Sequence, residues 1–231
     1  MDLSDVDTLF LDAGGVLVQP RRRRVTAALA DRGIVVDPDL LPEAHYRGMA
    51  AVDRARSEPE VFRDYHEAYV DHLGLEGVER DRAIAVLRPL YAPGSLLWDE
   101  PLDGVVDALR LLDARGVTMV VVSTAAGSVA EVLASAGVLQ VGTGPGVGIA
   151  AIVDSGVVGF TKPDPRIFQH ALELVGADPL RTVHIGDAYE FDVRGARGAG
   201  IRPVLVDPFD LHPEADCPRV LGIADLAERW H

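Results

Sequence analysis

Residues 117–122 constrain the fold of this chain more than any other segment. The run is apolar and rich in β-branched residues, which is typical of a strand buried on both faces of a sheet. Short apolar runs at 8–11, 182–185 and 203–206, and a further one at 149–153, alternate with segments of helical periodicity. This alternation predicts an α/β fold with a doubly wound, Rossmann-like parallel sheet covered by helices.

A long helical segment separates the first two of these strands. Apolar and aromatic residues recur at helical spacing, as in Tyr65, Tyr69 and Leu73. The segment is too long for an ordinary crossover between parallel strands. We therefore expect two domains: an α/β core of residues 1–19 and 94–231, and an all-helical domain of residues 20–93 inserted after the first strand.

The charge balance argues against several classes of partner. Asp and Glu number 36 against 22 Lys and Arg, so the formal net charge is −14. Binding to nucleic acid or to an anionic membrane surface requires a basic face, and we expect neither partner. No apolar run is long enough to cross a membrane, and the N-terminus does not resemble a signal peptide. Together these features predict a cytoplasmic protein.

Polar residues stand where the predicted strands end. Asp12, Ser123 and Asp187 each follow an apolar run, Asp192 lies five residues after Asp187, and Lys162 precedes a predicted helix. The carboxyl ends of parallel strands share one edge of the sheet, where ligands bind. These five side chains are therefore expected to converge on one site.

The charges of these groups indicate what the site binds. Asp12, Asp187 and Asp192 together carry −3, and hard oxygen ligands of this kind suit Mg²⁺. Lys162 is the only lysine among the 22 basic residues, and together with Mg²⁺ it brings the sum to zero. A phosphate group can then enter, with Ser123 and backbone N–H groups holding its oxygens. The Asp12 carboxylate is the natural nucleophile toward phosphorus and would form an aspartyl phosphate.

Four segments in order resemble the motifs of the haloacid dehalogenase (HAD) superfamily. They are DAGGVL at 12–17, VVVST at 120–124, KPDPRIF at 162–168 and GDAYEFDV at 186–193. The helical segment lies where this family carries its helical C1 cap. The resemblance implies a Mg²⁺-dependent hydrolase, phosphatase-like, acting on a small phosphorylated metabolite. By the same resemblance Asp12 is the nucleophile, Ser123, Thr124 and Lys162 bind phosphate, and the metal is held by Asp12, Asp187, Asp192 and the backbone carbonyl of Gly14.

Gly14 departs from the pattern of the family's phosphatases. The resemblance places a second Asp there, which serves as general acid and then as general base. Its loss removes on the order of 10²–10⁴-fold in rate. One alternative is therefore a phosphate-binding or regulatory protein with little or no turnover. Another is a haloacid dehalogenase-type hydrolase, which the absence of an aromatic residue in the first motif and the presence of the metal carboxylates disfavour.

Residues of the helical segment are candidates to replace the missing acid. His45 and Tyr46 are two, although a packing or surface role is the favoured interpretation of both. The run from Arg21 to Arg24 favours a solvated charge cluster at a hinge, with contact to an anionic substrate as its alternative. The sequence does not distinguish a monomer from a homodimer.

Overall fold

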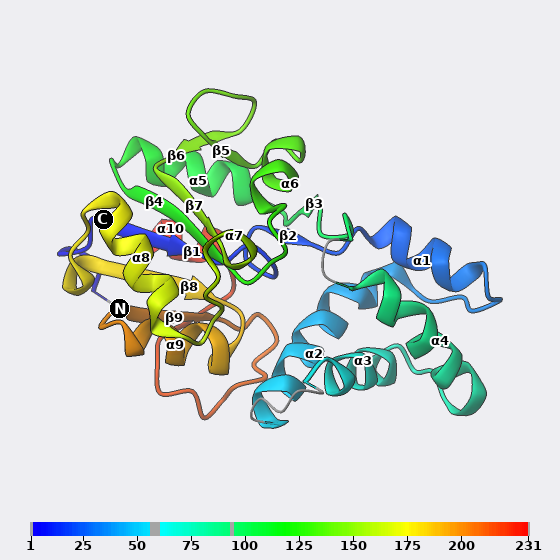
Figure 1. The fold of residues 1–231 in the computed structure, drawn as a ribbon. Helices are drawn as coiled ribbons and strands as arrows, with labels where there is room; N and C mark the ends of the chain where they lie inside the picture. The colour runs from blue at the N-terminus through cyan, green and yellow to red at the C-terminus, as the bar shows by residue number, and fades with distance from the viewer. Residues whose placement is uncertain (1, 56–60, 93–94, 231) are drawn as a thin grey trace.

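The central sheet is built from parallel strands in the order β10-β9-β8-β1-β4-β7. The structure is a computed structural model that describes residues 2–55, 61–92 and 95–230. Figure 1 shows the sheet in the part of the molecule that holds both termini. The strands are β1 Thr8–Leu11, β4 Thr118–Ser123, β7 Ala151–Asp154, β8 Thr182–Gly186, β9 Arg202–Val206 and β10 Arg219–Val220. The predicted parallel α/β sheet is confirmed.

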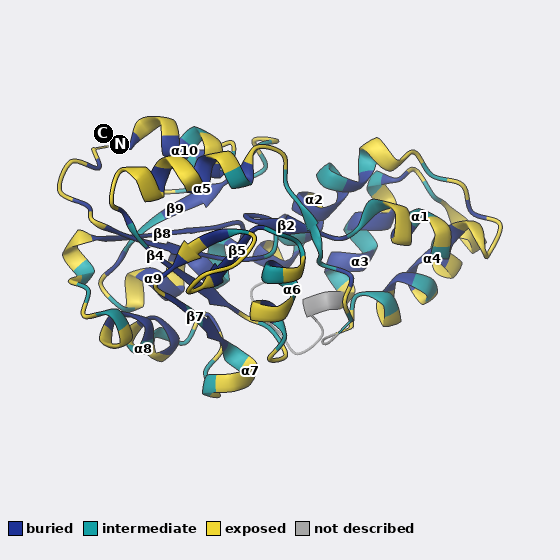
Figure 2. Ribbon diagram, turned by 90° about the horizontal axis from the view of Figure 1, so that it is seen from above, coloured by how far each residue is buried: buried dark blue, intermediate teal, exposed yellow. Residues whose placement is uncertain are grey.

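Helices cover both faces of this sheet, which confirms the doubly wound arrangement. Successive residues of a strand point to opposite faces: Leu9 and Leu11 pack with α5, α6 and α10, whereas Phe10 packs with α8 and α9. The buried sides of these helices face the sheet and their exposed sides face outward (Figure 2). The helices are α5 Val105–Ala114, α6 Val129–Ser135, α8 Pro165–Val175, α9 Arg194–Gly198 and α10 Ile223–Arg229.

Local sequence determines where α8 begins and ends. The Asp164 side chain accepts a hydrogen bond from the Arg166 N–H, and Pro165 occupies the first helical position, where no N–H is needed. Gly176 ends the helix with φ of 67°, a backbone conformation that favours glycine. Lys162 stands in the loop immediately before this start of α8.

Four helices form a second compact part between β2 and β3, which we call the helical insert. They are α1 Arg22–Ala30, α2 Leu41–Ala55, α3 Val61–His72 and α4 Gly77–Leu90, with the 3-10 turn η1 Pro38–Leu40 before α2. Their buried residues make a hydrophobic cluster of their own, which includes Leu29, Tyr69 and Leu87. Figure 1 shows the insert beside the carboxyl ends of the sheet strands.

A short antiparallel pair, β2 Val18–Gln19 and β3 Glu100–Pro101, joins the insert to the core. The arginine run begins here: Arg21 Nε lies 2.8 Å from Asp99 Oδ1, and Arg22 Nε lies 2.6 Å from Glu100 Oε1. The start of the charge run thus lies at the connection between the insert and the core, where Arg21 and Arg22 are ion-paired; a role as a hinge remains a prediction. The domain boundary predicted at 19/20 coincides with the end of β2, and the one at 93/94 falls outside the described residues.

The strand expected at 149–153 is shifted. Ile149 instead ends β6 Val147–Ile149, which pairs with β5 Leu139–Val141 in a separate parallel ribbon, and the sheet strand β7 begins at Ala151. Two short strands run together here as one apolar stretch, so the pattern does not show the break. The remaining helical turns are α7 Ser155–Val158, η2 Pro179–Arg181 and η3 Tyr189–Val193.

Within the described part of the chain, no helix has the length and apolar character to cross a membrane.

Candidate active site

Three carboxylates meet at the carboxyl edge of the central strands. Asp12 follows β1, and Asp187 follows the adjacent strand β8, with Leu11 opposite Ile185 in the register. Asp192 returns toward them from the first turn after β8. One carboxylate oxygen from each aspartate lies within 4.8 Å of the other two, and all three residues are buried. The structure thus brings together the three acids that the sequence predicts for a metal site.

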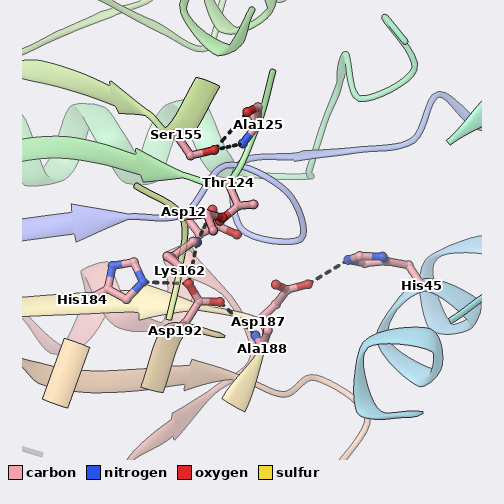
Figure 3. Close-up of polar contacts among 11 residues, drawn as sticks. Asp12, His45, Thr124, Ala125, Ser155, Lys162, His184, Asp187, Ala188 and Asp192 are labelled. Carbon is pink, nitrogen blue, oxygen red and sulfur yellow. Dashed lines mark hydrogen bonds and ion pairs between the residues drawn. The ribbon is translucent and has the colours of Figure 1, made fainter. Parts of the chain in front are cut away.

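Lys162 bridges two of these acids. Its Nζ lies 2.7 Å from Asp12 Oδ1 and 2.6 Å from Asp192 Oδ1, and the residue is buried (Figure 3). The Lys162 ammonium therefore links Asp12, after β1, to Asp192, in η3, and fixes the position of one carboxylate relative to the other.

Asp192 has further protein partners. His184, on β8, places Nε2 2.9 Å from Asp192 Oδ1, and the N–H of Ala188 donates to Asp192 Oδ2 over 3.1 Å. With Lys162, both carboxylate oxygens of Asp192 are engaged. Sequence reasoning missed His184, although a histidine inside a buried apolar strand is itself a signal, because its ring nitrogens need a polar partner.

The ionisation of the cluster reflects burial and mutual repulsion. Burial, reinforced by the charges of Asp192 and Asp187, raises the pKa of Asp12 from 3.8 to about 7 despite the nearby ammonium. Burial by itself would lower the pKa of Lys162, but its two carboxylate partners hold it above the ordinary value. Burial opposes the charge of Asp192 too, yet Lys162 and His184 keep its pKa below the ordinary range.

The donor set fits a divalent cation. Three carboxylates and one ammonium sum to −2, and burial raises the pKa of Asp187 as well as that of Asp12. The cluster therefore carries an excess of negative charge, and one divalent cation would neutralise it. Carboxylate oxygens are the ligands that Mg²⁺ prefers.

The helical insert reaches the cluster through α2. His45 Nε2 lies 2.8 Å from Asp187 Oδ2, and its Nδ1 lies 2.9 Å from the Tyr65 hydroxyl. When the Asp187 carboxylate is ionised it can only accept, and His45 then donates from Nε2. Tyr46 donates from its hydroxyl to the carbonyl of Gly15 over 2.7 Å. The favoured packing or surface interpretation of these two residues is thus incomplete, because both touch the loop or the acids of the site.

The two glycines after Asp12 have different surroundings. Gly15 has φ of 67°, and a Cβ atom there would overlap the Asp187 carboxylate. Gly14 is outside the left-handed region, and a Cβ atom would lie 3.2 Å from Cζ3 of Trp98. The indole ring of Trp98 therefore covers the position at which the resemblance to HAD phosphatases implies a second acid.

The predicted phosphate-binding residues follow the neighbouring strand β4. Ser123 is buried at its end, and Thr124 is exposed, with its hydroxyl 3.2 Å from that of Thr161. Asp154, the last residue of β7, and Ser155 after it hold the loop that follows β4. The Asp154 carboxylate accepts from the backbone N–H groups of Gly127 and Val129. The Ser155 hydroxyl accepts from the N–H of Ala125 and donates to its carbonyl (Figure 3).

Known proteins resemble this chain in sequence over part of their length. The human haloacid dehalogenase-like hydrolase domain-containing protein 3 is 33% identical over 135 residues, which cover 57% of this chain and 51% of that protein. A phosphoserine phosphatase of Thermus thermophilus is 43% identical over 89 residues, which cover 38% of this chain and 35% of that protein. The chain spans about half the length, or less, of these curated relatives.

The fold and the family are matched over nearly the whole chain. The HAD-hydrolase YfnB from Bacillus subtilis has a similar fold, with a TM-score of 0.63, 18% identity and coverage of 98% of this chain and 99% of that one. A family model described as a haloacid dehalogenase-like hydrolase matches residues 6–200, a range that contains all four motifs. The chain therefore belongs to the haloacid dehalogenase-like hydrolases.

Proposed function

We propose that the protein is a Mg²⁺-dependent phosphatase that hydrolyses a small phosphorylated metabolite through an aspartyl phosphate at Asp12. The observation that carries this proposal is the placement of Asp12 against Lys162 within a cluster of three buried carboxylates. Relatives named phosphoserine, glyceraldehyde 3-phosphate and phosphoglycolate phosphatase support the substrate class. The cytoplasmic location expected from the sequence remains a prediction.

The residues divide the work by position. The Asp12 carboxylate attacks phosphorus, and the Lys162 ammonium stabilises the charge of the phosphoryl oxygens. Ser123, Thr124 and N–H groups of the loop after β4 bind the remaining oxygens. Asp12, Asp187, Asp192 and the Gly14 carbonyl would hold Mg²⁺, with Asp192 acting indirectly because its oxygens already have partners. When bound, Mg²⁺ supplies charge neutralisation and polarises the phosphoryl group.

A phosphatase screen with and without Mg²⁺ tests the proposal. We expect phosphate release from small phosphate esters that depends on the metal. Asp187→Ala should weaken Mg²⁺ binding sharply in a calorimetric titration, and Asp192→Ala should weaken it less, because Asp192 acts through water. Unchanged Mg²⁺ affinity in Asp187→Ala would show that the metal binds elsewhere.

Gly14 favours a second candidate, a protein that binds phosphate with little turnover. The three carboxylates and Lys162 oppose this candidate, since a site without turnover has no need to retain a nucleophile against an ammonium. The same carboxylates oppose a metal-free dehalogenase. Two assays beside the phosphatase screen separate these candidates. Phosphate that binds in a calorimetric titration, with no release from any ester, supports the phosphate-binding protein, and halide release from haloacids without metal supports the dehalogenase.

The missing acid predicts a preference among leaving groups. Without a proton donor at position 14 the leaving group departs unprotonated, so aryl and acyl phosphates should react on the order of 10²–10⁴-fold faster than alkyl phosphates. Water also lacks a base at that position, so dephosphorylation of Asp12 should be slow. We expect a burst of product followed by a slow steady state, measured by rapid quench with an activated aryl phosphate.

Two variants show whether the site has another acid. Gly14→Asp should raise alkyl phosphate turnover; the backbone accepts a side chain there, and the Trp98 ring must move by a few tenths of an ångström. If the wild type hydrolyses alkyl and aryl phosphates at similar rates, the leaving-group account is wrong. His45 would then be the donor to test, and His45→Gln would lower alkyl turnover selectively. Tyr46 is a poorer acid, because burial and the Asp187 charge raise its pKa well above the ordinary value.

A further inference from the structure

One face of helix α2 makes a set of polar contacts with the core. His45 and Tyr46 contact Asp187 and Gly15, as described above. Asp53 lies two helical turns after Tyr46, so it stands on the same face of the helix. Figure 3 shows this helix approaching the acid cluster from the side of His45. Asp53 differs from the other two, because it contacts neither the nucleophile loop nor a carboxylate.

The Asp53 carboxylate accepts from three donors of the core. Its Oδ2 lies 2.8 Å from the backbone nitrogen of Tyr189 and 2.9 Å from His212 Nε2, and its Oδ1 lies 2.8 Å from the backbone nitrogen of Glu190. The side chain is only 6% exposed. Hydrogen bonds to a buried carboxylate are among the stronger ones, and their donors lose a partner that water does not replace if the carboxylate is removed.

Two of these donors belong to the loop that carries Asp187 and Asp192. Tyr189 and Glu190 lie between Asp187 and Asp192 and form the first turn of η3, whose N–H groups have no partner within the helix. An Asp at the start of a helix ordinarily satisfies such groups from within its own chain segment. Here the acceptor comes from the helical insert, 136 residues away in sequence. His212 follows β9, the next strand of the sheet.

We propose that Asp53 is a positioning residue through which the helical insert sets the geometry of the metal-bearing loop 187–192. The seated insert orders the N–H groups of Tyr189 and Glu190, and this holds Asp187 and Asp192 at their places in the cluster. Coupling between two equilibria is reciprocal, so a metal bound at Asp187 also favours the seated insert. The metal half of this inference rests on the proposed function, whereas the contact of Asp53 with the loop does not.

Asp53→Asn tests this role by two measurements that do not use turnover. In the metal-free protein, the amides of Tyr189 and Glu190 should exchange with deuterium about tenfold faster or more, because an amide side chain offers one acceptor in place of a carboxylate. Mg²⁺ affinity, measured by calorimetry, should fall roughly tenfold. The matched control is Asp178→Asn. Asp178 caps η2 through the Leu180 N–H, away from the acid cluster, and its replacement should change neither quantity.

Unchanged exchange at Tyr189 and Glu190 in a folded Asp53→Asn variant would overturn the proposal, as would an unchanged Mg²⁺ affinity. If that variant does not fold, the wild type supplies the test: Mg²⁺ must slow amide exchange both at 189–190 and in α2, and slowing confined to the core overturns the coupling. A chain that shows this coupling but releases phosphate from no ester contradicts the proposed function and leaves the role of Asp53 intact.

Discussion

Asp12→Asn should lose phosphatase activity by at least roughly 10⁴-fold, because an amide has neither the negative charge nor the nucleophilic oxygen that attack on phosphorus requires. The structure adds that this variant should remain folded. Burial raises the pKa of the Asp12 carboxyl to about 7, so its charge is disfavoured in the native state. Lys162 also keeps Asp192 as a carboxylate partner when Asp12 is replaced by its neutral isostere. Steady-state phosphate release and thermal unfolding measure the two quantities.

Asp7→Asn is the matched control for this variant. Asp7 stands at the opposite end of β1 and pairs with Arg181 at the surface. Its replacement changes the charge by the same amount at the other end of the same strand without touching the acid cluster, so activity should stay near that of the wild type. Turnover close to the parent level in Asp12→Asn would remove Asp12 from the role of nucleophile.

Lys162→Met should abolish activity and lower stability strongly. The ammonium contacts Asp12 and Asp192 directly, and its removal leaves buried carboxylates without their cation. Breaking a buried ion pair costs about 3–5 kcal/mol, which for a chain of this size lowers the unfolding temperature by roughly 10 °C. Because the net charge of the cluster becomes more negative, added Mg²⁺ should raise the unfolding temperature of the variant more than that of the wild type.

The stability of the folded protein should depend on pH through the Asp12 carboxyl, with a sign that follows from its pKa. In the metal-free wild type, Asp12 has a pKa of about 7 in the folded state against 3.8 as its ordinary value. In this range the folded state therefore keeps the Asp12 proton that the unfolded chain releases, and the contribution of Asp12 to stability falls as the pH rises from 3.8 through about 7. Without the ammonium this fall should be steeper. The double variant Lys162→Met/Asp192→Asn should recover part of the stability, and a single variant as stable as the wild type would contradict the account.

The sequence by itself determined the sheet and the acids at its edge. Buried parallel strands read as apolar runs, and the polar residue that ends each run must lie at the edge where the strand ends. The parallel topology puts Asp12 and Asp187 at the same edge of the sheet. That their strands β1 and β8 are direct neighbours in register is a finding of the structure. The role of Lys162 could also be predicted from the sequence, since a lone lysine in an arginine-rich chain suggests a specific role.

Only the tertiary structure decided which groups support those acids. His45 meets Asp187 across 142 residues of sequence, and Asp53 meets Tyr189 across 136. No periodicity encodes these contacts, because they depend on how the helical insert packs as a unit and on the direction in which the hinge presents it. The same holds for Trp98 over Gly14. Local sequence propensity determines where helices and strands begin and end. Contacts between the helical insert and the core depend instead on the shape and charge of the two surfaces that meet.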